Sequence, residues 1–347
     1  MPTILNISEF LDMGANGPVF DVRSPAEYKK GHIPGAINAP IFDDAERASV
    51  GTAYVKQGRE QAVIKGLELI GSKMHVYAKN MLSTCAEKTA FIYCWRGGMR
   101  SRSVAFLLEM AGCKAFLPEG GYKSYRNLLL REFEKDSNVV VLGGLTGSGK
   151  TDCLLELERL GGQVLDIEGI AKHKGSAFGH IGLEEQPSTE HFQNLLFEKW
   201  HTFDLTKPIF LEDENSDLGK VNLPEPLFAK IRSSNIIILE MPVNIRVQKL
   251  VTEYTGTDDE LLTAAVKRLE RRLGSENMQK AVSDIENGNY HGACEILLTY
   301  YDKAYLKSVD NRDKQTIVNI HTDTADARTN AELILKQLKE HQWNRTR

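Results

Sequence analysis

Short apolar runs alternate with longer amphipathic stretches over the first part of the chain. Pro18–Phe20 and Ala90–Tyr93 are apolar runs of the length typical of buried strands. Ser101–Ala111 has the apolar spacing of a helix. Strands that alternate with helices indicate a layered α/β fold. We therefore predict an N-terminal α/β domain over residues 1–137.

A polar stretch, Arg131–Ser137, separates this part from a second series of strands and helices that begins at Val139–Leu142. Val243–Tyr305 has an almost wholly helical pattern. We predict a second α/β domain over residues 138–347, with a mostly parallel P-loop-type sheet and a helical C-terminal part. Its other strand candidates are Val164–Asp166, Pro208–Leu211, Ile236–Leu239 and Thr316–Val318.

The composition adds limits to this picture. A chain of 347 residues that is 41% hydrophobic is long enough for two cores. It has no apolar stretch long enough to span a membrane and no secretory signal, so we expect a cytoplasmic protein with no membrane partner. Five scattered cysteines without zinc-ligand spacing predict neither disulfides nor a structural metal. Because the net charge is -4, a nucleic-acid partner would need a local basic patch.

The segment Cys94–Ser101, Cys-Trp-Arg-Gly-Gly-Met-Arg-Ser, joins a predicted strand directly to a helix. Its two glycines permit a curled backbone whose N–H groups converge on an anion above the sulfur. The helix N-terminus and the guanidinium groups of Arg96 and Arg100 favour a thiolate, which predicts that Cys94 is a nucleophile. The alternative is a small buried apolar residue, and this is our interpretation of Cys85, Cys113, Cys153 and Cys294.

The upstream run Asp21–Ala36, together with the cysteine loop, resembles a rhodanese domain. The resemblance implies that the loop cysteine carries a persulfide or its selenium equivalent. It also implies that Asp21 and Arg23 lie beneath the site. A salt bridge at a strand end that only shapes the scaffold is the alternative for these two residues.

The segment Gly144–Thr151 matches the pattern G-x-x-x-x-G-K-[ST], after a strand and before a helix. Backbone amides of such a loop cradle phosphate oxygens, its lysine neutralises them, and its threonine hydroxyl can bind Mg²⁺. A P-loop recognises a diphosphate but says little about the group attached to it. The candidate phosphate-binding residues are Gly144, Gly147, Ser148, Gly149, Lys150 and Thr151.

Acidic residues after two predicted strands are candidates for the metal side of the P-loop. Glu212 and Asp213, in the run that ends with Glu214, are the first choice. Asp166 and Glu168 could play that part instead. A solvated acidic turn is the competing interpretation.

Two basic segments are candidate contacts for RNA or phosphate. The glycine-broken loop that starts at Lys172 offers Lys172, His173, Lys174 and Ser176, although it could equally be a solvated connection. Arg268, Arg271 and Arg272 fall on adjacent turns of a predicted helix, where an RNA-facing stripe and a solvated helix face are both open.

Three motifs that occur together in this chain restrict the protein families that it can resemble. The cysteine loop, the P-loop and the segment His173–Gly179, with Glu46–Gly58 between the rhodanese halves, resemble the tRNA 2-selenouridine synthase family. The resemblance implies a tRNA substrate whose anticodon loop carries a 5-substituted 2-thiouridine at the wobble position, in the lysine, glutamate and glutamine tRNAs. It also implies geranyl diphosphate and selenophosphate as co-substrates, with S-geranylation followed by replacement of the geranylthiol by selenium.

The chemistry of the two loops fits these two successive reactions. We expect the P-loop to stabilise the diphosphate leaving group, and Cys94 to carry selenium while Arg96 and Arg100 hold selenophosphate. Trp95 or Tyr122 could stack on the splayed wobble base, or both could be packing aromatics.

Two other classes of function stay open. One is a persulfide sulfurtransferase with a regulatory nucleotide-binding P-loop domain, which activity of residues 1–137 alone would support. The other is a kinase-like enzyme that hydrolyses ATP or GTP, although no base-specific motif such as N-K-x-D occurs.

Overall fold

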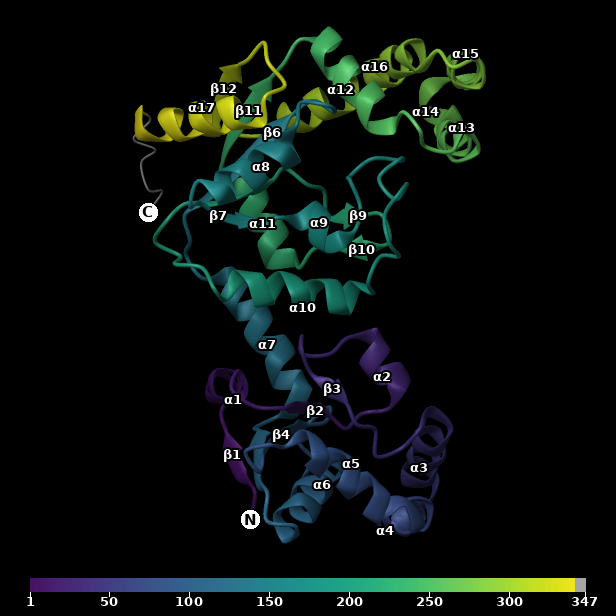
Figure 1. The fold of residues 1–347 in the computed structure, drawn as a ribbon, viewed down its shortest axis with the longest axis vertical. Helices are drawn as coiled ribbons and strands as arrows, with labels where there is room; N and C mark the ends of the chain where they lie inside the picture. The colour runs from purple at the N-terminus through teal and green to yellow at the C-terminus, as the bar shows by residue number, and fades with distance from the viewer. Residues whose placement is uncertain (341–347) are drawn as a thin grey trace. The chain divides into compact units, whose positions relative to one another are not determined.

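The computed structural model describes residues 1–340, and these form two compact units (Figure 1). The first unit comprises Met1–Phe133 together with Glu190–Glu198. The second comprises Glu134–Thr189 and residues 199–340. A segment that lies far along the sequence therefore packs with the N-terminal unit.

The first unit contains a five-stranded sheet in the order β1-β5-β4-β2-β3, in which every neighbouring pair is parallel. Residues of β4 alternate between its two faces. Ala90 and Ile92 pack in the core beneath α5 and α6, whereas Phe91 contacts Phe10 of α1 and Tyr93 stacks near Tyr122 of α7. The strands are β1 (Thr3–Leu5), β2 (Val19–Asp21), β3 (Ile37–Asn38), β4 (Thr89–Tyr93) and β5 (Lys114–Pro118).

Helices cover both faces of this sheet, and α3 to α5 form an insertion between β3 and β4 (Figure 1). Capping boxes begin α1, α2 and α3, since a side chain at each N-cap exchanges hydrogen bonds with a glutamate three residues later. The helices are α1 (Ile7–Gly14), α2 (Pro25–Lys30), α3 (Asp44–Gln57), α4 (Arg59–Ile70), η1 (Gly71–Lys73), α5 (Met74–Thr84), α6 (Met99–Met110) and α7 (Gly121–Glu134).

The second unit contains another five-stranded parallel sheet, in the order β12-β11-β6-β8-β7, and a short antiparallel ribbon. The predicted fold class, two parallel α/β sheets with a helical C-terminal part, is confirmed. The strands are β6 (Val139–Gly144), β7 (Gln163–Leu165), β8 (Ile209–Glu212), β9 (Asp217–Leu218), β10 (Val221–Asn222), β11 (Asn235–Glu240) and β12 (Ile317–His321).

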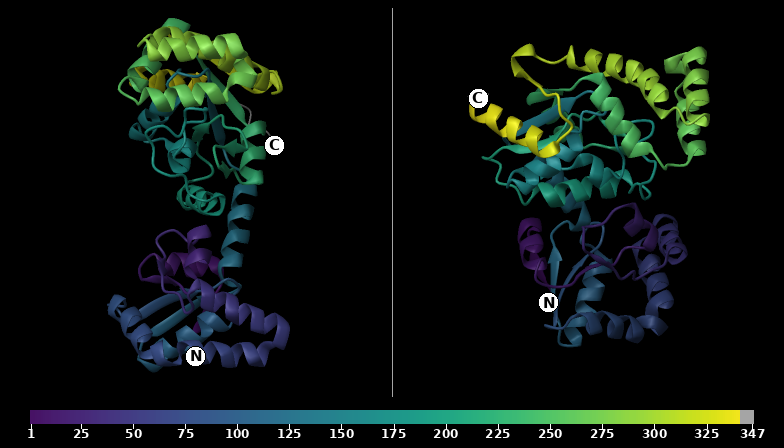
Figure 2. Two further views of the ribbon diagram at one scale, coloured as in Figure 1. Left: turned by 90° about the vertical axis from the view of Figure 1, so that its right-hand side faces the viewer. Right: turned by 45° about the horizontal axis from the view of Figure 1, so that its top comes forward.

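One face of this sheet packs on α8 and α17, and a second core forms among α13 to α16. Figure 2 shows the long helix α16 leading from this helical cluster back to the sheet. Among residues 1–340, no helix is long and apolar enough to cross a membrane. The helices are α8 (Lys150–Arg159), α9 (Ile167–Ala171), α10 (Thr189–Trp200), α11 (Glu225–Ser233), α12 (Val243–Tyr254), α13 (Asp259–Arg268), α14 (Glu270–Leu273), α15 (Ser275–Glu286), α16 (Tyr290–Val309), η2 (Lys314–Thr316) and α17 (Ala327–Glu340).

Candidate active sites

Cys94 lies directly after β4, at the base of a curled loop. Its side chain is 3% exposed, and its Sγ lies 3.2 Å from the Oγ of Ser101, in the first turn of α6. The loop is held against the start of α7, where the backbone N–H of Tyr122 donates to the Cys94 carbonyl. Gly121 is required there, because a Cβ atom would lie 2.4 Å from both the carbonyl oxygen of Cys94 and the nitrogen of Gly97. The sulfur thus has a polar partner at a helix N-terminus.

The two arginines of the loop have different surroundings. Arg100 donates two hydrogen bonds to the Glu27 carboxylate, with distances of 2.6 and 3.2 Å, so its guanidinium is fixed in direction. Burial favours a raised pKa for Glu27, but the hydrogen bonds and charge of Arg100 outweigh it and the pKa is lowered. Arg96 is exposed to solvent. Glu27 is therefore a positioning partner that the sequence motif did not indicate.

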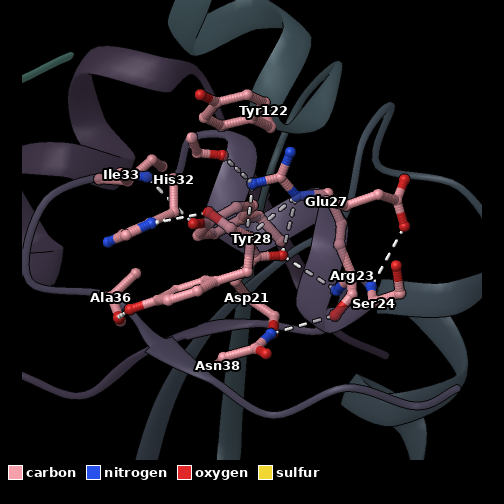
Figure 3. A network of polar contacts seen from close by, with 12 residues as sticks. Asp21, Arg23, Ser24, Glu27, Tyr28, His32, Ile33, Ala36, Asn38 and Tyr122 are labelled. Carbon is pink, nitrogen blue, oxygen red and sulfur yellow. Dashed lines mark hydrogen bonds and ion pairs between the residues drawn. The ribbon is translucent and has the colours of Figure 1, made fainter. Parts of the chain in front are cut away.

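A buried polar network lies next to the loop (Figure 3). Asp21 at the end of β2 accepts hydrogen bonds from both the backbone and the guanidinium of Arg23, and both side chains are almost fully buried. The guanidinium carbon of Arg23 lies 3.9 Å from the centroid of the Tyr122 ring. A further hydrogen bond from Arg23 reaches the carbonyl of Gly31. The pair holds the turn after β2 and the start of α7 together.

Tyr122 is completely buried, and its hydroxyl accepts a hydrogen bond of 2.7 Å from the Asn194 side chain. It is therefore a packing aromatic residue. Trp95, with 36% of its surface exposed, remains a candidate platform for a base. Asn194 belongs to the segment Glu190–Glu198 and also bonds to Arg126 and to the carbonyl of His32. These contacts explain why that segment packs with the first unit.

Removing Arg23 should destabilise the first unit strongly. Arg23→Met leaves the buried Asp21 carboxylate without its partner, and breaking such a pair typically costs about 3–5 kcal/mol. Denaturant unfolding followed by tryptophan fluorescence measures the change. Lys65→Met, which removes an exposed ion pair with Glu68, should cost less than about 1 kcal/mol. Equal losses for the two variants would contradict a structural role for the Asp21–Arg23 pair.

The P-loop follows β6 and wraps into the first turn of α8. Gly147 has a φ of 82°, and a Cβ atom there would lie 3.0 Å from the side chain of Leu250 and 3.1 Å from the carbonyl of Arg246. Lys150 Nζ donates to the carbonyl of Gly144 at 2.9 Å, and the N–H of Gly144 donates to the hydroxyl of Tyr305. Ser148 is buried, and its Oγ has no hydrogen-bond partner among the described residues.

A cavity of about 1480 Å³ opens above this loop within the second unit. Most of the predicted phosphate-binding residues line it, whereas the side chain of Ser148 is buried beneath. The P-loop follows β6, the central strand of this parallel sheet, and the crevice outside the carboxyl ends of such strands is the usual place for a ligand. The P-loop residues that line it are Gly144, Gly147, Gly149, Lys150 and Thr151.

The two acidic residues of first choice have other partners. Glu212 is fully buried outside the cavity lining, and its Oε2 accepts a hydrogen bond from the backbone N–H of Ile167. Asp213 lines the cavity but forms ion pairs with Arg232 and Arg312. Both carboxylates thus have polar partners within the second unit.

Glu168 contacts the P-loop threonine, and Glu214 lies near Glu168. Thr151 Oγ1 donates to Glu168 Oε2 at 3.0 Å, and a Cβ placed on Gly175 would lie 2.8 Å from Glu168 Oε1 and 2.9 Å from Glu214 Oε1. Burial, and then the charge of Glu168, raises the pKa of Glu214 well above its ordinary value. Glu214 was visible in sequence only as the end of an acidic run. Among residues 1–340, no three His, Cys, Asp or Glu residues form a metal site by themselves.

Glu212 should make stability depend on pH. Burial raises its pKa well above the ordinary value, so the folded protein holds this proton more tightly than the unfolded chain. Stability is therefore lost as pH rises, and Glu212→Gln should remove part of that loss. Thermal unfolding of both proteins from about pH 5 to about pH 9 measures it. A wild-type midpoint that falls with pH no more steeply than that of Glu212→Gln would contradict the prediction.

Three of the four candidate residues in the basic loop after α9 line the same cavity. Lys172, Lys174 and Ser176 line it, and the two lysines form ion pairs with Glu184 and Glu253. His173 is buried, is absent from the lining, and has a pKa lowered mainly by burial.

The three candidate arginines of the C-terminal part do not form one stripe. The helix is interrupted at Leu269, so Arg268 ends α13 whereas Arg271 and Arg272 belong to α14. Only Arg272 lines the cavity, and its Nη1 donates to the hydroxyl of Tyr300 at 3.3 Å.

The fold and the two sites define a two-domain enzyme that joins a rhodanese-like domain to a P-loop domain. The family model described as the tRNA 2-selenouridine synthase AAA domain matches residues 137–334, and the rhodanese-like domain model matches residues 6–128. The chain belongs to the tRNA 2-selenouridine synthase family.

Relatives in this family match over nearly the whole chain. The tRNA 2-selenouridine synthases of Bdellovibrio bacteriovorus and Nitrosomonas europaea are each 33% identical, over 86% of this chain and 90% of their own. That of Marinobacter nauticus is 32% identical over 92% of this chain and 97% of its own. The similarity therefore includes both units.

Proposed function

We propose that this chain converts a 5-substituted 2-thiouridine at the wobble position of tRNA to 2-selenouridine, in the lysine, glutamate and glutamine tRNAs. Family membership supports selenouridine formation in tRNA as the overall reaction. The pairing of a cysteine loop with a P-loop cavity supports two chemical steps. Geranyl diphosphate and selenophosphate are the proposed co-substrates.

The observation that carries the first step is the P-loop cavity. When the 2-thiouridine sulfur attacks the allylic carbon of geranyl diphosphate, the carbon–oxygen bond breaks and negative charge develops on diphosphate. Lys150 and the loop amides around Gly147 line the cavity and would stabilise that charge. Thr151, Glu168 and Glu214 offer the oxygen ligands that Mg²⁺ prefers, and the ion would supply further positive charge to the leaving group.

The observation that carries the second step is the loop around Cys94. The sulfur lies at the N-terminus of α6, within hydrogen-bond distance of the hydroxyl of Ser101, where the helix N-terminus suits an anionic ligand. The loop amides and Arg100, oriented by Glu27, suit the phosphate oxygens of selenophosphate. We assign selenium transfer to this site. The phosphorus–selenium bond of selenophosphate breaks with water as the phosphoryl acceptor, phosphate leaves, and the selenide displaces geranylthiol from C2 of the base.

Mass spectrometry of the wobble nucleoside tests this function. The purified chain is incubated with 2-thiouridine-containing tRNA, and each co-substrate is left out in turn. We expect a geranylated base without selenophosphate, and 2-selenouridine only when both co-substrates are present. Unmodified 2-thiouridine in the complete mixture would contradict the proposal and favour a persulfide sulfurtransferase with a regulatory P-loop domain.

A further inference from the structure

The lining of the cavity above the P-loop includes two groups of residues that differ in chemistry. The P-loop contributes backbone amides and Lys150, which suit a diphosphate. Two helices contribute tyrosine rings: Tyr254 at the end of α12, and Tyr300 and Tyr301 in α16. We call these three residues the tyrosine wall. With about 1480 Å³, the cavity exceeds the size of an ordinary small-ligand pocket and has room for a second substrate beside the diphosphate.

The rings of the tyrosine wall are held in place by polar contacts and packing. The Tyr301 hydroxyl accepts a hydrogen bond from the backbone N–H of Ala177 at 3.2 Å, and Tyr254 packs edge-on against Phe178. The centroids of Tyr300 and Tyr301 lie 5.2 Å apart. A tyrosine is neutral at neutral pH, and burial raises the pKa of Tyr301 further, to about 12, so its hydroxyl does not repel a polyanion. The planes of the Tyr300 and Tyr301 rings are tilted by 59°, so a planar base can stack on one ring at a time. A ring that is already held in place binds a planar ligand with little loss of side-chain entropy.

A cation without an acidic partner stands at this wall. Arg272 donates to the hydroxyl of Tyr300 and forms no ion pair among residues 1–340. The two lysines of the neighbouring basic loop already form ion pairs with glutamates. Arg272, in contrast, can bind a phosphate without first breaking an ion pair. Aromatic rings beside an arginine are the combination by which proteins bind unpaired nucleotides, with stacking on the base and charge on the backbone.

We propose that the tyrosine wall binds the unpaired wobble nucleoside of the RNA by stacking, and that Arg272 binds a phosphate of the adjacent backbone. This inference rests on the proposed function, since it identifies where the acceptor of the geranyl group lies. The base and the diphosphate then share one cavity, as a direct attack of the base sulfur on the allylic carbon requires.

Binding of an anticodon stem-loop RNA with 2-thiouridine at the wobble position tests the wall. Tyr300→Leu and Tyr301→Leu in the full chain should each weaken RNA binding about tenfold, because each loses an aromatic stacking surface. Tyr300→Phe and Tyr301→Phe keep the ring and should stay within about twofold of wild type. Fluorescence anisotropy measures the affinity. Unchanged binding of inorganic diphosphate by the leucine variants shows that the P-loop side is intact.

Arg272 is tested by salt dependence. Arg272→Ala should lower the slope of log affinity against log salt concentration by about one, as the loss of one phosphate contact does. Arg271→Ala, at the exposed neighbouring position outside the lining, is the matched control and should leave the slope unchanged.

The outcomes separate the inference from the function on which it rests. Wild-type protein that binds the RNA while both leucine variants bind it equally well would overturn the inference alone. Wild-type protein that does not bind the RNA would overturn the proposed function as well. Weaker binding of both RNA and inorganic diphosphate by the leucine variants would mean that the wall only supports the fold of the cavity, which also overturns the inference.

Discussion

Lys150→Ala should slow geranylation of the tRNA about a hundredfold to a thousandfold while leaving the chain folded. The side chain contributes one hydrogen bond to the loop, to the carbonyl of Gly144, so its loss costs little stability. Its charge, however, stabilises the leaving diphosphate in the transition state. Removing one such group typically lowers a rate about a hundredfold to a thousandfold. Mass spectrometry of the wobble nucleoside under single-turnover conditions measures the geranylation rate.

A tRNA that is already geranylated shows which of the two steps the Lys150→Ala substitution affects. Supplied with tRNA that is already geranylated, Lys150→Ala should form 2-selenouridine at the wild-type rate, because that step does not release diphosphate. Lys207→Ala is the matched control, since Lys207 is an exposed lysine that pairs with Asp204 and does not line the cavity. A geranylation rate of Lys150→Ala within about threefold of wild type would contradict the assignment of the P-loop to this step.

The central strands of both sheets were predictable because burial on both faces makes them continuous apolar runs. The runs at Val139–Leu142 and Ile236–Leu239 correspond to β6 and β11. The short strands β1 and β3 lie at the edges of the first sheet, where one side has no partner strand. Ile4 of β1 is half exposed, so no buried apolar pattern marked it. Edge strands depend on the strand they join, which a local pattern does not reveal.

The residues of the candidate sites also differ in whether the sequence alone could predict them. The cysteine loop and the P-loop are each one continuous segment of the sequence. Each contains its glycines, its cation and its nucleophile or hydroxyl within a few consecutive residues. The Glu168–Glu214 pair forms only because β7 and β8 are neighbours, so the segments that follow them meet at one edge of the sheet. The sequence offered several acidic residues there without a reason to choose among them.

The tyrosine wall and the packing of Glu190–Glu198 needed the tertiary structure for a different reason. Tyrosines at helical spacing are typical of a core, and only their position in the cavity lining gives these three a further role. Asn194 looks like any polar residue on a helix surface. It is fully buried, and its side-chain amide bonds to the Tyr122 hydroxyl and the His32 carbonyl, far away in the sequence. Burial of polar groups is decided by such partners.

Cys94→Ala should have the opposite effect to Lys150→Ala, because it should block selenium transfer and leave geranylation active. Without the sulfur nucleophile, we expect geranylated tRNA to accumulate while selenium incorporation falls about a thousandfold or more. The cavity that contains the P-loop is formed by the second unit alone, which is why geranylation should continue. Mass spectrometry with both co-substrates present measures both products in one sample.

Cys85→Ala is the matched control for this variant, because Cys85 is a buried cysteine of the same core cluster but lies outside the loop. It should form 2-selenouridine at close to the wild-type rate. Selenouridine formed by Cys94→Ala at the wild-type rate would contradict the role of Cys94. Loss of geranylation together with selenium incorporation would instead show that Cys94 acts in both steps, because the P-loop and its lysine are intact in this variant. The product that each of Cys94→Ala and Lys150→Ala fails to form thus assigns each chemical step to one unit.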